Sequence, residues 1–308
     1  MIVREYYQRG APDPVLDQDH VLGLVRRHIG KAAAVTGVDE TGGEARVYVV
    51  DDRVILKVQR PQQLRSWTSL EKEVVFLRRI AADAPDLPVP RVLGYGRDGS
   101  VEYTCMTRMP GDAAVRTPIA AEERPLALRA VGRVLRRIHG INQAELRASG
   151  LFPEEWTAAD LRQSVAQRVE DVSRRLEADG IAWPLSLPVA QVVAAAQAQV
   201  PASPPAVALH TNPGPTHTFV DPVSGRFLGL IDFGDAYIGH PAFDLWQWGD
   251  PADRDWVAAG YAEEGALPDE FWRFWTVVQA LSDLTAIARQ RPYAPLAAGH
   301  LAELVRRW

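Results

Sequence analysis

The chain has 308 residues, 47% of them hydrophobic, which is enough for one large domain or two lobes and argues against a disordered protein. A formal net charge of −5 argues against nucleic-acid binding, and the single cysteine excludes an intrachain disulfide or a cysteine-based zinc site. No apolar run has the length of a signal peptide or a membrane span, so the sequence predicts a soluble cytoplasmic protein, either a monomer or a homodimer.

The first 105 residues combine two helical patterns with several strand patterns. The expected elements are a helix over 16–29, a strand entering Gly42-Gly43, strands over 46–50 and 53–58 around an Asp51-Asp52 turn, a helix within 66–84 capped by Ser66 or Thr68, and two strands around Asp98-Gly99. This alternation predicts a β-rich lobe.

The pattern after residue 111 is mainly helical. Helical spacing covers 120–140, 158–178, 188–200, 253–264, 268–290 and 294–307. The stretch "ALHTNPGPTHTFVDPVSGRFLGLIDFGDA", residues 208–236, is instead typical of three short strands with a polar turn, in the manner of a hairpin. We therefore expect an α+β protein with an N-lobe over 1–105, a hinge at 106–111 and a helical C-lobe over 112–308.

The chemistry-bearing residues follow one another in an informative order. A glycine pair precedes a strand lysine and a helix glutamate, and a histidine-containing turn then precedes "IDFGDA" and "YIGHPAFDLW". From about Val38 to Trp248 this order resembles the protein-kinase-like fold, and within it the aminoglycoside phosphotransferase and choline-kinase-like enzymes. The resemblance implies a two-lobed fold, ATP or GTP with Mg²⁺ as cofactors, and phosphoryl transfer to the hydroxyl of a small molecule.

Lysine is rare in this chain, with three lysines among 34 basic residues. Lys57 lies in the apolar strand "RVILKVQ", where a compact point charge differs from what arginine offers. The resemblance assigns Lys57 to the α- and β-phosphates of a nucleotide, paired with Glu73 or, as the alternative, Glu71. The competing interpretations are an edge-strand lysine and a surface glutamate.

Backbone groups and apolar walls would complete the nucleotide site. Gly42 and Gly43 let backbone N–H groups approach phosphates, although glycine pairs also mark ordinary turns. Met106 and Met109 lie at the expected hinge, where the resemblance places an adenine; ordinary packing explains them equally well.

Asp232 follows the apolar strand "FLGLI" and precedes Phe233-Gly234, so its carboxylate emerges at a strand end. The resemblance assigns it to Mg²⁺, with His217 at the second ligand position, where imidazole is softer than Mg²⁺ prefers. His217 contacting a phosphate, or lying on the surface, is the alternative. The resemblance assigns His210 a structural role beneath the loop. It implies that Asp244 supports the catalytic loop, and an N-cap role is the alternative for Asp244.

Asn212 occupies the position where the resembling enzymes have a catalytic aspartate. An asparagine can orient an acceptor hydroxyl but cannot take its proton, and loss of a general base typically costs about 10²- to 10⁴-fold in rate. Three interpretations stay open: a weak kinase, a pseudokinase that binds nucleotide or a small molecule, or a substitution introduced into an active enzyme.

The acceptor site is the least determined part. Aspartates outnumber basic residues between 207 and 250, which suits a neutral or cationic alcohol. The candidate substrate contacts are Asp235, Asp250 and Trp246, with Asp283 and Trp248 as weaker candidates, whereas Trp272 and Trp275 are expected in the core. Nothing in these residues decides between an aminoglycoside, choline, a macrolide, a sugar or an amino alcohol.

Overall fold

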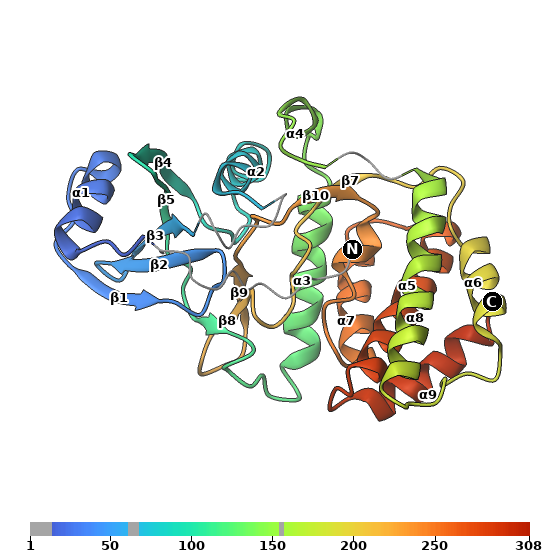
Figure 1. Cartoon of the computed structure of the whole chain (residues 1–308). Coiled ribbons are helices and arrows are strands. Elements are labelled where there is room, and N and C mark those ends of the chain that lie inside the picture. The colour runs from blue at the N-terminus through green and yellow to red at the C-terminus, as the bar shows by residue number, and fades with distance from the viewer. Residues whose placement is uncertain (1–13, 61–67, 154–156) are drawn as a thin grey trace.

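The computed structural model describes residues 14–60, 68–153 and 157–308, and these form two lobes joined side by side (Figure 1). The N-lobe comprises α1 (Gln18–Ile29), β1 (Val35–Asp39), β2 (Ala45–Val50), β3 (Val54–Gln59), α2 (Leu70–Asp83), β4 (Val92–Asp98) and β5 (Val101–Thr107). Its five strands form an antiparallel sheet in the order β1-β2-β3-β5-β4. The predicted β-rich lobe is thus present.

Local chemistry explains the tight turn between β2 and β3. Asp51 and Asp52 both have positive φ, 51° and 54°, a conformation that aspartate tolerates better than most residues and that suits a tight hairpin turn. The Asp51 carboxylate also accepts hydrogen bonds from the backbone of Ala33 and Ala34. This fixed turn sets the register of β2 against β3, in which Lys57 lies opposite Val47.

The C-lobe is mainly helical. It comprises β6 (Asp112–Ala113), α3 (Arg124–His139), α4 (Ala144–Ala148), α5 (Ala158–Ala178), α6 (Val189–Ala198), β7 (Val207–Leu209), β8 (Thr218–Val220), β9 (Phe227–Leu230), β10 (Tyr237–Gly239), the 3₁₀ helix η2 (Pro241–Asp244), α7 (Pro251–Glu263), α8 (Asp269–Ala288) and α9 (Ala294–Val305). Helices α3 and α7 cross closely at glycines, since a Cβ on Gly132 would lie 2.0 Å from the Val257 carbonyl oxygen and one on Gly260 2.1 Å from that of Arg129. None of the helices in the described ranges has the length and apolar character that a membrane span requires.

Three expectations need correction. Strand β5 continues through Met106 to Thr107, so the irregular connection covers 108–111 and begins two residues later than the predicted hinge. The N-cap of α2 is Ser69, whose side chain accepts from the Lys72 N–H; Ser66 lies outside the described residues, and Thr68 bonds elsewhere.

The third correction concerns the stretch 208–236. Its three strands are present, but they do not form one hairpin: β8 pairs with β9, whereas β7 pairs with the later strand β10. The chain therefore leaves β7, makes the loop 210–217 and enters a different sheet, which exposes that loop to the space between the lobes.

Helix α2 connects the lobes physically. A smaller hydrophobic cluster unites α1 with β2, β3 and β5, but Phe76, Leu77 and Ile80 of α2 belong to the large cluster that continues through the C-lobe. Phe76 meets Phe233 edge-on, with ring centroids 5.4 Å apart. The position of α2 is thus tied to the segment that begins at Asp232.

Candidate active site

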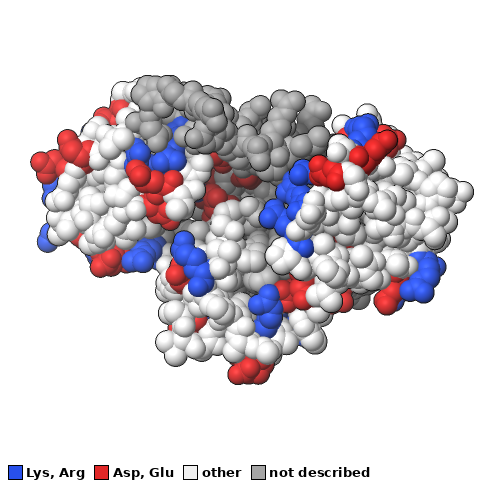
Figure 2. Space-filling view, turned by 60° about the horizontal axis from the view of Figure 1, so that its bottom comes forward, with Lys and Arg blue, Asp and Glu red and all other residues white. Residues whose placement is uncertain are grey.

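A cleft of about 700 Å³ lies between the lobes, lined by residues of both. Its walls include the Gly42-Gly43 loop, β3 and α2 from the N-lobe, and the segments 212–217 and 231–235 from the C-lobe. On the face drawn in Figure 2, acidic and basic side chains are interspersed. The cleft brings together most of the residues that the sequence nominated.

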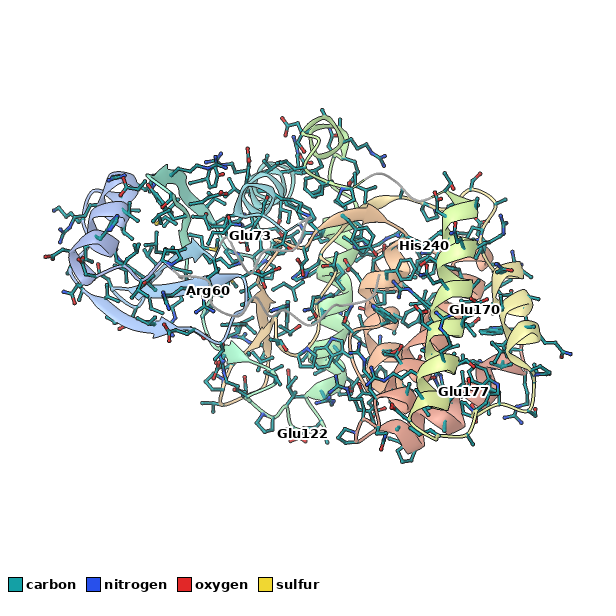
Figure 3. The ribbon with its side chains drawn as sticks, viewed as in Figure 1. Arg60, Glu73, Glu122, Glu170, Glu177 and His240 are labelled. Carbon is teal, nitrogen blue, oxygen red and sulfur yellow. The ribbon has the colours of Figure 1, made fainter. Side chains whose placement is uncertain are left out.

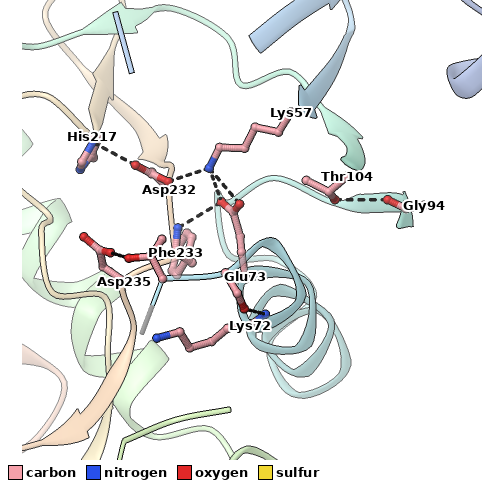
Figure 4. A network of polar contacts seen from close by, with 11 residues as sticks. Lys57, Lys72, Glu73, Gly94, Thr104, His217, Asp232, Phe233 and Asp235 are labelled. Carbon is pink, nitrogen blue, oxygen red and sulfur yellow. Dashed lines mark hydrogen bonds and ion pairs between the residues drawn. The ribbon is translucent and has the colours of Figure 1, made fainter. Parts of the chain in front are cut away.

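Lys57, Glu73 and Asp232 meet at the centre of the cleft (Figure 4). The Lys57 Nζ lies 2.8 Å from Oε2 of Glu73 and 2.6 Å from Oδ1 of Asp232. Glu73, rather than the alternative Glu71, is the helix partner, and its Oε1 also accepts from the Phe233 N–H at 3.1 Å. One ammonium therefore joins a strand and a helix of the N-lobe to a carboxylate of the C-lobe.

The charges of this group support one another. Burial favours the neutral amine of Lys57, but the Asp232 and Glu73 carboxylates outweigh it and raise the pKa of Lys57 above its ordinary value. Burial acts to raise the pKa of Asp232 as well, but that side chain is still 42% exposed, so the Lys57 ammonium prevails and holds its pKa below the usual range. Lys57 and Asp232 are hence both charged near neutral pH.

The backbone holds Asp232 in a strained conformation. Its φ is +70°, in the left-handed region that residues other than glycine rarely adopt. Such strain persists only where surrounding contacts enforce it, and it concentrates at functional sites. Lys57 and the Glu73–Phe233 bond supply these contacts on the two sides of the residue.

His217 faces the other oxygen of Asp232. Its Nδ1 lies 2.9 Å from the Asn212 carbonyl oxygen, and its Nε2 lies 3.3 Å from Asp232 Oδ2. Because a carbonyl oxygen only accepts, Nδ1 carries the proton, and the lone pair of a neutral ring then points from Nε2 at a carboxylate oxygen. Two acceptors that face each other require a cation between them, either a proton or a metal ion.

This donor set fits a divalent cation. A histidine that ligates a metal commonly donates its other N–H to a backbone carbonyl, as His217 does. Within the described ranges no cluster of three or more histidine, cysteine or acidic side chains is arranged to hold a metal. Mg²⁺ commonly takes one or two protein carboxylates and completes its shell with water and phosphate oxygens, so the Asp232 carboxylate fits it, whereas the imidazole of His217 is a softer ligand than Mg²⁺ prefers.

The loop that carries Asn212 is held from beneath by Asp244. The two oxygens of this buried carboxylate accept from the N–H groups of His210, at 2.7 Å, and Thr211, at 2.6 Å. Thr211 has a φ of +78°, which is unusual for a β-branched residue and is enforced by this bond. Asn212 follows it, exposed and lining the cleft.

Asp244 is in turn oriented by a residue that the sequence analysis missed. His139, the last residue of α3, lies with Nε2 2.9 Å from Asp244 Oδ2 and with Nδ1 2.9 Å from the Tyr261 hydroxyl. The available signal was its place four residues after Leu135, on the apolar face of an amphipathic helix. Its buried partners come from α7 and η2, more than a hundred residues away.

His210 lies beneath the loop, as expected of a structural histidine. It is fully buried, its Nδ1 accepts from the Asn212 N–H at 3.4 Å, and its ring packs on Phe233 with centroids 4.4 Å apart. Burial lowers the pKa of this imidazole to about 4, so it is neutral at physiological pH.

The remaining nominated residues divide between the cleft and the body of the C-lobe. Met106, Met109 and Asp235 line the cleft, and Asp235 accepts a hydrogen bond from the Thr68 hydroxyl. Trp246 and Asp250 are not among the described residues that line it. Trp246 stacks with the Arg168 guanidinium, and Asp250 caps α7 through the Ala252 N–H, so the cleft geometry gives their predicted substrate roles no support.

The other aromatic and acidic candidates have structural positions. Trp248 is buried and donates from Nε1 to the Pro213 carbonyl oxygen at 3.2 Å, which fixes the loop after Asn212. Asp283 is buried against Arg254 and His300 between helices. Trp275 is buried and Trp272 packs against the same core, in agreement with the expectation for both.

Comparison with known proteins agrees with this architecture. The sequence model of the phosphotransferase enzyme family matches residues 38–280. No curated protein sequence matches significantly. Among solved structures, the GDP complex of an aminoglycoside 2'-phosphotransferase is similar with a TM-score of 0.63 at 12% identity, over 95% of this chain and 99% of that one.

Two further structures share the fold. A type I macrolide 2'-phosphotransferase gives a TM-score of 0.54 at 20% identity, over 92% of this chain and 96% of its own. An ADP-bound aminoglycoside phosphotransferase gives 0.56 at 13% identity, over 93% and 96%. At these identities the likeness concerns the fold, which is kinase-like with two lobes.

Proposed function

Because this chain belongs to the phosphotransferase enzyme family, we propose that it transfers a phosphoryl group from ATP or GTP to a hydroxyl of a small molecule, with Mg²⁺ as cofactor. The observation that carries the proposal is the convergence of Lys57 from one lobe and Asp232 from the other, 2.6 Å apart in one cleft. A polyphosphate entering this cleft would meet an ammonium and a metal-binding carboxylate together.

The N-lobe residues would bind and orient the nucleotide. Lys57 would bind the phosphate oxygens, and Glu73 would hold its ammonium in place, since that carboxylate is anchored by the Phe233 N–H. Gly42 and Gly43 would approach the phosphates with backbone N–H groups. Met106 and Met109, which line the cleft near the connection between the lobes, would contact the base.

His217 and Asp232 would hold the Mg²⁺ ion, which when bound neutralises charge on the transferring phosphoryl group. His217 is prepared for this by its bond to the Asn212 carbonyl, which leaves the Nε2 lone pair directed at Asp232.

Asn212 would orient the acceptor hydroxyl through its carboxamide oxygen. It has no basic group that can take the proton, so we expect turnover to be slow rather than absent, because phosphoryl transfer depends mainly on positioning and electrostatic stabilisation. The second candidate function, a pseudokinase that binds nucleotide or a small-molecule ligand without turnover, is favoured by this one residue. An asparagine introduced in place of a native aspartate would leave the rest of the proposal unchanged.

The acceptor would be a neutral or cationic alcohol, such as an aminoglycoside, a sugar or an amino alcohol. The described cleft walls carry more carboxylates than cations, namely Asp39, Glu44, Glu73, Asp112, Asp232 and Asp235 against Lys57, Arg108 and Arg116. Solved relatives are named for aminoglycosides and for a macrolide, which supports the same class. Asp235, which lines the cleft from the C-lobe, would contact such a substrate.

The test has two parts. Thermal unfolding with ATP or GTP, with and without Mg²⁺, should show stabilisation that depends on the metal. Phosphoryl transfer to a panel of aminoglycosides and amino alcohols should then be faster in Asn212→Asp by about 10²- to 10⁴-fold, the usual contribution of a general base.

The matched control is Asn142→Asp, which adds the same charge at an exposed site outside the cleft and should change neither result. Absence of stabilisation by either nucleotide would overturn the proposal. Stabilisation without turnover in wild type, but with turnover in Asn212→Asp, would select the pseudokinase.

A further inference from the structure

The glycine loop between β1 and β2 is held from behind by Arg60, the residue that follows β3. Its Nη1 donates to the Gly42 carbonyl oxygen at 2.7 Å and lies 3.4 Å from that of Glu40. Its own N–H donates to the Glu44 carbonyl oxygen at 2.8 Å. Arg60 is only 8% exposed and lies within the N-lobe, close to the sheet (Figure 3).

Strand alternation places Arg60 on the side of the sheet away from the cleft. Lys57 and Gln59 of β3 line the cleft, so Val58 and Arg60 point to the opposite face, where Val58 joins the core beneath α1. Arg60 is accordingly not among the described cleft-lining residues, although Gly42 and Gly43 are.

The planarity of the peptide bond transmits this contact to the cleft. In a trans peptide the C=O and the following N–H point in opposite directions, and the described residues contain no cis peptide. The Gly42 carbonyl points to Arg60, so the Gly43 N–H points away from it, to the cleft side. Over the described ranges, this N–H donates to no protein acceptor.

We propose that Arg60 is a positioning residue that orients the Gly42–Gly43 peptide so that the Gly43 N–H binds a phosphate oxygen of the nucleotide. The inference rests on the proposed function and extends it to a residue outside the cleft. Arginine suits the role because its planar guanidinium is rigid and stays charged when buried, whereas a lysine offers a flexible point charge. The guanidinium of Arg60 binds the carbonyl groups of the loop, and the Gly43 N–H stays available to the ligand.

The test compares Arg60→Met with wild type in calorimetric titrations of ATP, GTP, adenosine and guanosine. A lost hydrogen bond to a charged group corresponds to about tenfold or more in Kd. We expect Arg60→Met to weaken binding of the preferred triphosphate by about tenfold and to leave binding of its nucleoside unchanged. Arg60→Lys should restore part of the loss, because an ammonium can still donate to the Gly42 carbonyl.

Arg46→Met is the matched control. Arg46 is similarly buried, at 6% exposed, and lies on the neighbouring strand β2. It donates to the Glu40 side chain and the Pro14 carbonyl, and not to the Gly42 carbonyl. The Arg46→Met variant should have the same ratio of nucleoside Kd to triphosphate Kd as wild type, whatever its effect on stability. Circular dichroism and thermal unfolding confirm the fold of each variant, and Arg60→Lys carries the test if Arg60→Met does not fold.

The outcomes separate the two proposals. A wild-type protein that binds neither triphosphate overturns the proposed function and this inference with it. A wild-type protein that binds triphosphate, with Arg60 variants that bind it equally well or that lose nucleoside affinity to the same extent, overturns the role of Arg60 alone.

Discussion

The two walls of the cleft are built differently. The N-lobe wall places its functional groups on regular elements: Lys57 on a strand paired on both sides, and Glu73 in the first turn of a capped helix. The C-lobe wall places Asn212, His217 and Asp232 on loops, with left-handed backbone at Thr211 and Asp232.

This difference shows where each wall obtains its precision. On the N-lobe side, strand and helix geometry are enough to aim a side chain. On the C-lobe side, the loops are fixed by buried polar groups from distant segments, chiefly Asp244 beneath Thr211 and His139 beneath Asp244. Substitutions at the contact between the walls should therefore have the largest effects, and those at a single helix cap the smallest.

The largest effect is expected for Lys57→Met, which removes the ammonium shared by both walls. Loss of one such electrostatic contact typically lowers turnover by about 10²- to 10³-fold, and an uncompensated buried Glu73 should also cost about 3–5 kcal/mol of unfolding free energy. Steady-state kinetics and chemical denaturation measure both. Lys31→Met, at an exposed lysine, is the control and should change neither.

Asp244→Asn tests whether the C-lobe wall depends on its remote anchor. An amide keeps the shape, but its NH₂ would face either the Thr211 N–H or, in the other orientation, the His210 N–H and His139. The free energy of unfolding should therefore fall by about 2–4 kcal/mol, and turnover should fall with it. Asp250→Asn is the matched control, since asparagine caps helices as well as aspartate. Lost activity in Asp250→Asn would instead restore Asp250 as a substrate contact.

Acidification should destabilise the C-lobe through its buried neutral histidines. Burial lowers the pKa of His240 to about 3 and that of His210 to about 4, from 6.5 when unfolded. At pH values between the folded and unfolded pKa, the unfolded chain binds more protons than the folded one. The free energy of unfolding therefore decreases as the pH is lowered, by about 2 kcal/mol for each histidine from pH 7 to pH 5.

His240→Asn isolates one of these contributions. Asparagine can keep the hydrogen bond from the Ala242 N–H but does not titrate. The difference in unfolding free energy between pH 7 and pH 5 should shrink by about 2 kcal/mol, whatever the variant's stability at pH 7. An unchanged difference would mean that His240 is not buried as a neutral group.

The smallest effect is expected for Ser69→Ala at the N-cap of α2. Loss of the bond from the Lys72 N–H should cost about 1 kcal/mol, measured by chemical denaturation, and Ser69→Asn should recover most of it. A loss of unfolding free energy several times larger would show that the N-lobe wall depends on this helix cap as strongly as the C-lobe wall depends on Asp244.

The contrast between the walls also explains what could be predicted from the sequence. The two lobes follow from local periodicity, and the pairing of Lys57 with Glu73 follows from the family resemblance that the order of the motifs carries. The direct contact between Lys57 and Asp232 was not predicted. His139 could not be nominated, because its role depends on a carboxylate about a hundred residues away. Trp246 and Asp250 were nominated for their chemistry, and the structure places them on Arg168 and at the start of α7, outside the described lining of the cleft.

Strand pairing was the other gap. The residues of 208–236 indicate three strands correctly, but they do not show that β7 pairs with β10 rather than with β8. That choice depends on β10, which lies after the stretch and was not predicted, and on the Asp244 anchor that turns the chain at Thr211.

The most direct measurement is calorimetric titration of ATP and GTP into wild type, Lys57→Met and Asp232→Asn, each with and without Mg²⁺. If both walls share one polyphosphate, Mg²⁺ should tighten nucleotide binding at least about tenfold in wild type. Asp232→Asn should lose this metal dependence. Lys57→Met should weaken nucleotide binding both with and without Mg²⁺. Triphosphate binding that is unaffected by Mg²⁺ and by both substitutions would contradict the account.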